Sequence, residues 1–411
     1  MNLSLYKQFR VHIIILLLVL YIFNIVPAIG IGKIGTREII SIIALLIIFP
    51  KFINNKYYRA LIIANWSQIL ISIIAAISNG TTDFWYVQFA IRNILYLNGA
   101  LLIVSLLPPK TSFYEFVLFI VAAILVNCFV ATICFFIPSA MDMLVTLQDL
   151  GDEDKINNTL RWSVRMIGLG CGNFYVGGII NGMGIISVFL LLVKNKIDSY
   201  LGVILLAILF FIGVFIARTT IIGLAIGLCY YFISAGSGKF VYFILISCLL
   251  LFAINYFEVF SSVNTSHAFE FFTLDTDSYQ SSQTMESLSS MYSVEIDSKT
   301  LIIGDGLSKY ANGKYYMHTD VGYLRNIFYF GIVGTIFGYF YYELRVLATV
   351  VKLSSELKVF VIFMFVFLLA LNFKGLPDFN FFIFLIIAYY LNKMRTIKKI
   401  RYENSSYYRR P

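Results

Sequence analysis

Residues 301–306 read LIIGDG and residues 318–325 read HTDVGYLR, and beyond Arg325 the chain turns apolar again through Gly334. These two motifs close the longest polar interruption in the sequence, which begins near Glu258. The rest of the chain reads as apolar runs joined by shorter connections. We therefore expect the chemistry of this protein to lie where the polar loop meets a membrane.

The composition places the chain in a lipid bilayer. Of its 411 residues, 60% are hydrophobic and only 13% are charged, and the mean hydropathy is +0.84. An average soluble domain is about 45–50% apolar and about 25% charged, so no soluble fold could bury this much apolar surface. Apolar runs of about 20 residues recur along the chain and favour a helical bundle over a β-barrel. The sequence predicts an all-α polytopic membrane protein with one integral membrane domain over residues 1–411.

We expect about twelve transmembrane helices and two sizeable loops on the outer face. The second and the last span are short, and the last is equally consistent with a tilted or interfacial segment. The two loops cover residues 139–173 and 259–320, and the second is expected to contain short helices. The expected spans are residues 11–29, 38–53, 60–78, 86–107, 113–138, 174–193, 200–217, 219–235, 240–258, 321–341, 357–373 and 379–392.

Basic residues in the connections orient the bundle, because Lys and Arg are enriched on the cytoplasmic side of membrane proteins. With the N-terminus inside, most of the 31 Lys and Arg residues fall on the inner side. This predicts that both termini are cytoplasmic. The net charge of +9 is then explained by topology and an anionic inner leaflet. Membrane lipid is an expected partner, and no nucleic-acid partner is needed.

Four arginines are expected at or just below the outer interface, on four different elements. Arg92 lies roughly 9 Å inside its span, where an arginine costs on the order of 2–3 kcal/mol unless it faces water or an anion. Arg165, Arg218 and Arg325 lie at the ends of other spans. Each one alone also reads as an interfacial anchor. The guanidinium fork binds phosphate oxygens in pairs, so together the four predict a clamp for the diphosphate of a polyprenyl lipid.

His318 and Asp320 are the candidate acid–base residues, because both stand at the membrane entry of the polar loop. Tyr323, one turn further on, is the candidate for stacking against a sugar. Each also has a purely structural interpretation. His318 would be an ordinary loop residue, and Asp320 would be the N-cap of the following helix, a role that is compatible with catalysis.

No cofactor or metal site is expected. The five cysteines lie in or beside apolar segments without Cys-x-x-Cys pairing, which favours packing over disulfides or metal binding. The acidic cluster at residues 149–154 fits no calcium-loop spacing and reads as a hydrated surface. Small-residue steps such as Gly178-x-x-x-Gly182 and Gly223-x-x-x-Gly227 indicate close helix packing.

Three short features carry a resemblance to a known family. The first is the run Arg165-Met-Ile-Gly-Leu-Gly, and the second is Ala217-Arg218-Thr219-Thr220 at the start of a span. The third is Gly304-Asp305-Gly306, followed by HTDVGY from His318 and a Gly331-x-x-Gly334 step. In these features, and in a layout that covers most of the chain, the sequence resembles the Wzy-type polymerases of bacterial O-antigen and capsular polysaccharide.

The resemblance implies a metal-independent glycosyltransferase of lipopolysaccharide or capsule biosynthesis, in the bacterial cytoplasmic membrane. Such an enzyme takes an undecaprenyl-diphosphate-linked glycan at the outer face and transfers its reducing end to a hydroxyl of the incoming lipid-linked repeat unit. The diphosphate lipid leaves. A chain-length regulator is a candidate partner.

Two other functions remain open. The related O-antigen ligases carry a histidine at the position that Asp320 occupies here, with His318 displaced by two residues, and this difference favours a polymerase. A flippase for lipid-linked oligosaccharide fits a twelve-span bundle but has little need of the long outer loop at residues 259–320.

Overall fold

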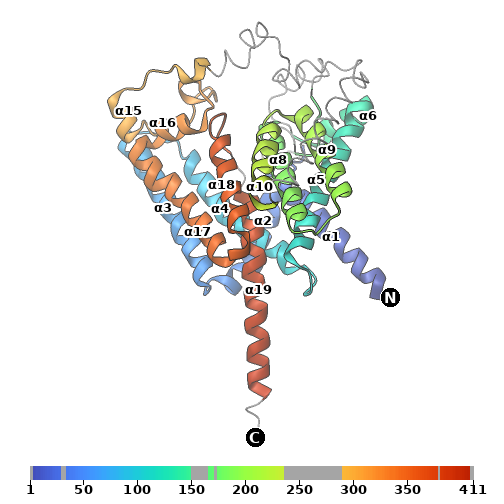
Figure 1. Cartoon of the computed structure of the whole chain (residues 1–411). Coiled ribbons are helices and arrows are strands. Elements are labelled where there is room, and N and C mark those ends of the chain that lie inside the picture. The colour runs from blue at the N-terminus through green and yellow to red at the C-terminus, as the bar shows by residue number, and fades with distance from the viewer. Residues whose placement is uncertain are drawn as a thin grey trace.

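The computed structural model describes residues 3–28, 34–149, 165–170, 174–235, 289–377 and 380–407, and these residues form helices joined by short connections (Figure 1). The first seven named helices are α1 (Leu3–Phe23), α2 (Thr36–Phe52), α3 (Lys56–Ser78), α4 (Trp85–Ser105), α5 (Phe113–Phe136), α6 (Pro138–Leu147) and α8 (Phe174–Val193). The rest are α9 (Ser199–Ile216), α10 (Thr220–Ala235), α15 (Ser298–Ile303), η2 (Tyr316–His318), α16 (Gly322–Gly334), η3 (Thr335–Phe340), α17 (Tyr341–Leu353), η4 (Ser355–Leu357), α18 (Lys358–Leu371) and α19 (Asn380–Tyr407).

The prediction of an all-helical polytopic membrane protein is confirmed in its main point. Within the described ranges, six helical stretches are long and apolar enough to cross a membrane: α3, α4, α5, α8, α9 and Gly322–Leu353, which is kinked at Gly331. Helices also occupy the other expected spans except residues 240–258, which lie outside the described residues. The full count of twelve spans stays a prediction.

Polar residues begin several of these helices by satisfying backbone N–H groups that have no partner inside the helix. Asn55 accepts from Tyr57 N at 2.9 Å at the start of α3. Ser112 and Glu115 form a capping box at the start of α5, in which each side chain bonds the other residue's backbone N–H. The helix boundaries at these turns therefore follow from local sequence.

The helix α8 and the first part of α19 are buried on all sides and lie at the centre of the bundle. In α19, residues 381–389 are at most 6% exposed, whereas residues 395–397 are exposed; whether this span is tilted or partly interfacial stays a prediction. The small-residue packing prediction is confirmed for α8 and α10. A Cβ on Gly223 would overlap the Gly182 backbone, so only glycine permits this approach.

The start of α1 and the end of α19 lie at one end of the molecule, and α6, α15 and α16 lie at the opposite end (Figure 1). The arrangement agrees with termini on a common side, and the assignment of that side to the cytoplasm stays a prediction. The loop at residues 139–173 includes α6, while residues 150–164 and 171–173 lie outside the described residues. The loop at residues 259–320 includes α15 and η2, while residues 259–288 lie outside them.

The expected span at residues 321–341 is broken near its middle. Gly331 has φ 65° and ψ −178°, a combination that is essentially restricted to glycine. In Figure 1, α16 lies across the end of the bundle that also carries α15, whereas α17 runs along the bundle. Arg325 therefore belongs to a helix at the surface end and not to a straight span.

The break at Gly331 explains the Gly304-Asp305-Gly306 motif. Asp305 N donates to the Phe328 carbonyl at 2.6 Å and Gly306 N to the Tyr329 carbonyl at 3.2 Å, which are carbonyls of the last turn before the break. Gly304 has φ +79°, and a Cβ there would lie 2.5 Å from Gly331 N. The two glycine steps thus fit against each other, backbone to backbone.

The connection between α3 and α4 holds the same loop from the other side. The Asp83 carboxylate accepts from Ser308 N at 2.7 Å, from Ser308 Oγ at 2.6 Å and from Lys309 N at 3.3 Å. Thr81 Oγ1 donates to the Gly306 carbonyl at 2.8 Å. Residues 304–309 are therefore fixed between α16 and the α3–α4 connection.

Candidate functional site

Arg165 begins an irregular run, residues 165–170, whose backbone is held by three other elements. Its guanidinium lies 4.9 Å from the centroid of the Phe174 ring at the start of α8. Such a run keeps its shape because its N–H groups find fixed acceptors. The bonds are Met166 N to the Phe215 carbonyl at 3.1 Å, Leu169 N to Asn127 Oδ1 at 2.6 Å and Gly170 N to Gln148 Oε1 at 2.7 Å.

Arg218 occupies the turn between α9 and α10, and this turn packs against α8. Gly178 makes the contact possible, because a Cβ there would overlap Thr219 Oγ1 and lie 2.8 Å from the Ala217 Cβ. Ile221 N donates to the Arg218 carbonyl at 3.0 Å as α10 begins. The arginine backbone is thereby fixed beside the N-terminal end of α8.

Lys374 occupies the connection between α18 and α19, which two tyrosines hold in place. Tyr175 of α8 donates its hydroxyl to the Leu371 carbonyl at 2.7 Å and lies 3.0 Å from the Gly375 carbonyl. Tyr323 of α16 donates its hydroxyl to the Leu369 carbonyl at 2.7 Å. The Lys374 turn is therefore tied to the helices that follow Arg165 and Asp320.

Gly322 lets α16 approach this turn. A Cβ on Gly322 would lie 2.5 Å from Asn372 Oδ1 and 2.6 Å from the Gly375 carbonyl. A larger residue would have to push the Lys374 turn away from Asp320, which lies two residues before Gly322.

Arg165, Arg218 and Lys374 gather into one group, called here the outer cationic cluster. Desolvation lowers the pKa of Arg165, and Arg218 lowers it further. The Lys374 side chain touches solvent, but protein surrounds it closely enough that desolvation lowers its pKa. The charges of Arg165 and Arg218 lower the pKa of Lys374 further, and the charge of Asp320 raises it. These mutual effects require short distances. Both arginines nevertheless stay charged at any relevant pH.

Asp320 is the acidic member of this group. It is half-buried and acts electrostatically on Lys374 and on Tyr175. The helix α16 begins at Gly322 with Val321 as its N-cap, and that cap makes no side-chain hydrogen bond. The N-cap position of α16 therefore belongs to Val321 and not to Asp320.

His318 lies apart from these contacts, although it is only two residues away in sequence. It is exposed, has φ +53° and packs its ring 5.5 Å from the Tyr310 ring. Its backbone N–H donates to the Tyr315 carbonyl at 3.1 Å. The recorded contacts of His318 and Asp320 thus involve different neighbours, and which of the two is the base stays a prediction.

Arg325 has its own surroundings. It is 7% exposed, and its guanidinium lies 4.4 Å from the Tyr315 ring centroid and 4.9 Å from that of Trp85. Its Nε and Nη2 atoms are buried without a hydrogen-bond partner in the part of the chain that the structure describes. Cation–π contact compensates part of the desolvation of such a charge. Arg325 therefore lies between two aromatic rings and keeps N–H groups that can donate to a ligand.

The two remaining candidates are placed as follows. Arg92 is exposed on α4, as are Gln88 and Ile91. Gln88 precedes Ile91 by three residues and Arg92 by four, so the three side chains lie on one face of the helix. Tyr323 is half-buried, and its ring meets the Phe373 ring edge-on at 5.0 Å. Their assignments to the clamp and to sugar contact stay predictions.

Sequence reasoning missed two residues of this site. Nothing in the local sequence of Lys374, Asn-Phe-Lys-Gly, distinguishes it from an interfacial anchor. Tyr175 directly follows Phe174 at the start of an apolar span, where a tyrosine reads as part of an aromatic belt. Both are recruited by contacts between helices about 200 residues apart in sequence.

Among the described residues, no group of three or more His, Cys, Asp or Glu side chains is arranged to hold a metal ion. The charged groups of the candidate site are of the types that bind anions, as in the outer cationic cluster, and that transfer protons, as with Asp320 or His318. No family model, curated protein or solved structure matches the chain.

Proposed function

We propose that this chain is a glycosyltransferase that polymerises undecaprenyl-diphosphate-linked oligosaccharide repeat units at the outer face of the bacterial cytoplasmic membrane. The observation that carries the proposal is the outer cationic cluster, in which Arg165, Arg218 and Lys374 come from three separate connections and act electrostatically on one another, while Asp320 acts on Lys374. Three cations in one group at the end of a membrane bundle suit a multiply charged anion attached to a lipid.

The reaction joins an acceptor hydroxyl to the anomeric carbon of the growing glycan. The hydroxyl oxygen attacks that carbon, the bond from the carbon to the diphosphate oxygen breaks, and its electron pair stays on the diphosphate. Negative charge therefore grows on the leaving group in the transition state. Fixed cations lower the barrier because they are already oriented before charge develops.

The residues divide these tasks. Arg165 and Arg218 offer planar forks for the diphosphate oxygens, and Lys374 adds a compact charge. Asp320, held next to the cations, accepts the proton of the attacking hydroxyl; His318 is the other candidate for this step. A single displacement of this kind inverts the configuration at the anomeric carbon.

The rigid setting of the cluster supports this proposal. The anchoring bonds of the Arg165 run and of the Lys374 turn fix these backbones before substrate arrives. Preorganised charge needs little rearrangement during the reaction. Arg92 and Arg325 are proposed as further cations on the path of the glycan, and a chain-length regulator as a partner.

The test is gel analysis of surface glycan from a strain that lacks the gene. A polymerase deletion leaves single repeat units on an intact anchor, and the normal ladder returns when the wild-type gene is restored. The Arg218→Ala variant should insert in the membrane at the normal level and fail to restore the ladder.

Other outcomes identify other functions. An unchanged ladder in the deletion strain contradicts the proposal. Full-length polymer stranded on its lipid carrier would instead identify a ligase, and repeat units retained at the inner leaflet would identify a flippase.

A further inference from the structure

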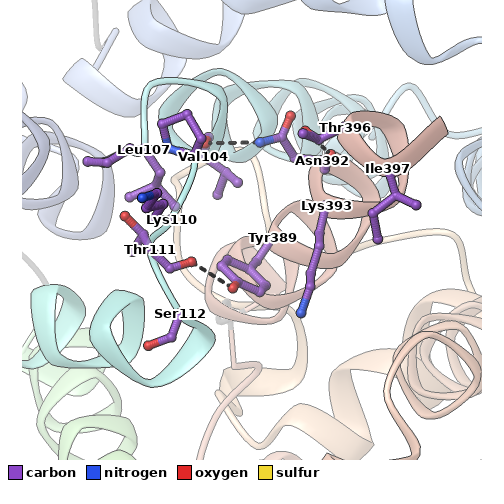
Figure 2. Close-up of a pocket in the computed structure, with 12 residues that line it drawn as sticks. Val104, Leu107, Lys110, Thr111, Ser112, Tyr389, Asn392, Lys393, Thr396 and Ile397 are labelled. Atoms are coloured by element: carbon purple, nitrogen blue, oxygen red, sulfur yellow. Dashed lines mark hydrogen bonds between the residues drawn. The ribbon is translucent and has the colours of Figure 1, made fainter. Parts of the chain in front are cut away.

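A second charged site lies at the opposite end of the bundle from the outer cationic cluster. A cavity of about 440 Å³ opens between the α4–α5 connection and the C-terminal half of α19 (Figure 2). Small-ligand pockets range from about 300 to 1,000 Å³, so this volume is large enough for a headgroup. We propose that the cavity binds the phosphodiester headgroup of an acidic phospholipid from the membrane leaflet on the side of the termini.

The charge of the lining points to an anion. Lys110 comes from the α4–α5 connection and Lys393 from α19, on opposite walls of the cavity (Figure 2). The lining contains no Asp or Glu, and neither lysine forms an ion pair with a residue that the structure describes. Two unneutralised ammonium groups facing one cavity attract a phosphate.

Arg10 adds a third positive charge beside the cavity. Its Nε donates to the Leu106 carbonyl at 2.9 Å, next to the lining residue Leu107. This bond also holds the start of α1 against the end of α4. Two carboxylates lie near the lining: Glu115 accepts from the backbone N–H of the lining residue Ser112 at 2.6 Å, and Glu356 lines a neighbouring hollow of about 270 Å³ that shares Lys393. Lys110, Lys393 and Arg10 outnumber these two carboxylates.

Hydrogen bonds between α19 and the region of the α4–α5 connection hold the walls of the cavity in place. The Tyr389 hydroxyl donates to the Thr111 carbonyl at 2.9 Å, and Asn392 Nδ2 donates to the Val104 carbonyl at 3.4 Å (Figure 2). These bonds tie α19 to both ends of the α4–α5 connection. The distance between the two lysine-bearing walls is thereby fixed.

The position and the mixed lining favour a lipid over a soluble anion. The cavity lies where α4 ends and α5 begins, at the level of lipid headgroups for two helices that cross a membrane. One part of the lining is apolar and suits the glycerol and upper acyl region, and the other is polar and suits the phosphate. The apolar residues are Val104, Leu107, Pro108, Pro109 and Ile397.

The proposal does not depend on the transferase reaction. It assigns Lys110 and Lys393 to a headgroup that bridges α19 and the α4–α5 connection. Since residues 381–389 of α19 are buried in the bundle, a lipid bound beside the following turns would hold that helix to the α4–α5 connection.

Native mass spectrometry of the purified full-length chain in detergent tests the proposal. The chain is titrated with dioleoyl-phosphatidylglycerol, dioleoyl-phosphatidylethanolamine and dioleoyl-phosphatidylcholine, and glycerol 3-phosphate is added as a soluble competitor. We expect one tightly retained phosphatidylglycerol and weaker retention of the other two lipids. Equal retention of all three, or displacement by glycerol 3-phosphate as effective as by the lipid, would overturn it.

Variants separate charge from shape. Removal of one lysine near a membrane surface lowers the affinity for an anionic lipid about fivefold, so Lys110→Gln with Lys393→Gln should lower it about 25-fold. Thr396→Trp keeps both lysines and fills the cavity, and should also lose the retained lipid. The matched control, Lys51→Gln with Arg59→Gln, removes two exposed charges from the same end. An equal loss in the control, or no loss in either pocket variant, contradicts the proposal.

Discussion

One tyrosine hydroxyl ties the turn that carries Lys374 to α8, which makes Tyr175→Phe a sharp perturbation of the candidate site. The hydroxyl donates to the Leu371 carbonyl at 2.7 Å and lies 3.0 Å from the Gly375 carbonyl. The Leu371 carbonyl also accepts from the backbone of Lys374 at 3.0 Å and of Gly375 at 3.1 Å. It therefore stays paired in the variant, and the loss falls on the link to Gly375.

The magnitude follows from one lost hydrogen bond. Such a bond contributes about 0.5–1.5 kcal/mol, and leaving a buried acceptor unpaired costs about 1–3 kcal/mol. We expect Tyr175→Phe to weaken the anchoring of the Lys374 turn by about 1–2 kcal/mol, a factor of about 5–30 in the ratio of anchored to displaced turn. Chain growth should fall by no more than this factor, because Arg165 and Arg218 remain.

The assay is the initial rate of glycan chain growth at matched amounts of membrane-inserted protein. Tyr21→Phe is the control, since the Tyr21 hydroxyl is also buried and donates to the Tyr96 carbonyl at 2.7 Å, between α1 and α4. The reasoning is refuted if Tyr175→Phe grows chains at the wild-type rate. It is equally refuted if Tyr21→Phe slows growth as much as Tyr175→Phe does.

Three further predictions concern charge, pH and backbone geometry. Arg218→Ala should abolish chain growth and Arg218→Lys should restore part of it, because lysine keeps the charge and loses the fork; equal activity of the two variants would contradict the clamp. The pKa of Lys374 lies below its ordinary value of 10.5, so affinity for undecaprenyl diphosphate, measured by equilibrium binding, should fall as pH rises towards that value. Because the unfolded chain binds the Lys374 proton more tightly, the free energy of unfolding rises with pH between the lowered pKa and 10.5. Lys374→Arg should remove the pH dependence of both the affinity and the free energy of unfolding. Gly331→Ala should cost about 1–3 kcal/mol and release residues 304–309 to protease, whereas Gly313→Ala, also at positive φ but with open space around it, should leave them protected.

The amino-acid sequence by itself determined that this is a helical membrane protein and where most of its helices lie. Apolar run length and the cost of burying unpaired backbone groups in lipid are local properties, so they can be read without knowing any contact. The helix starts at Asn55 and Ser112 follow from side chains within three residues of the backbone they cap. The sequence also placed Arg165 and Arg218 in two different connections between helices, as the structure has them.

Only the tertiary structure decided which of these residues meet. Lys374 and Tyr175 join the Arg165 and Arg218 neighbourhood through contacts between distant helices. His318 and Asp320, only two residues apart in sequence, contact different neighbours. The break at Gly331 has the same origin, because its backbone conformation is fixed by a loop about 25 residues earlier in the chain. Charge and hydropathy place a residue at a depth in the membrane, whereas its partners depend on the rotation and approach of whole helices.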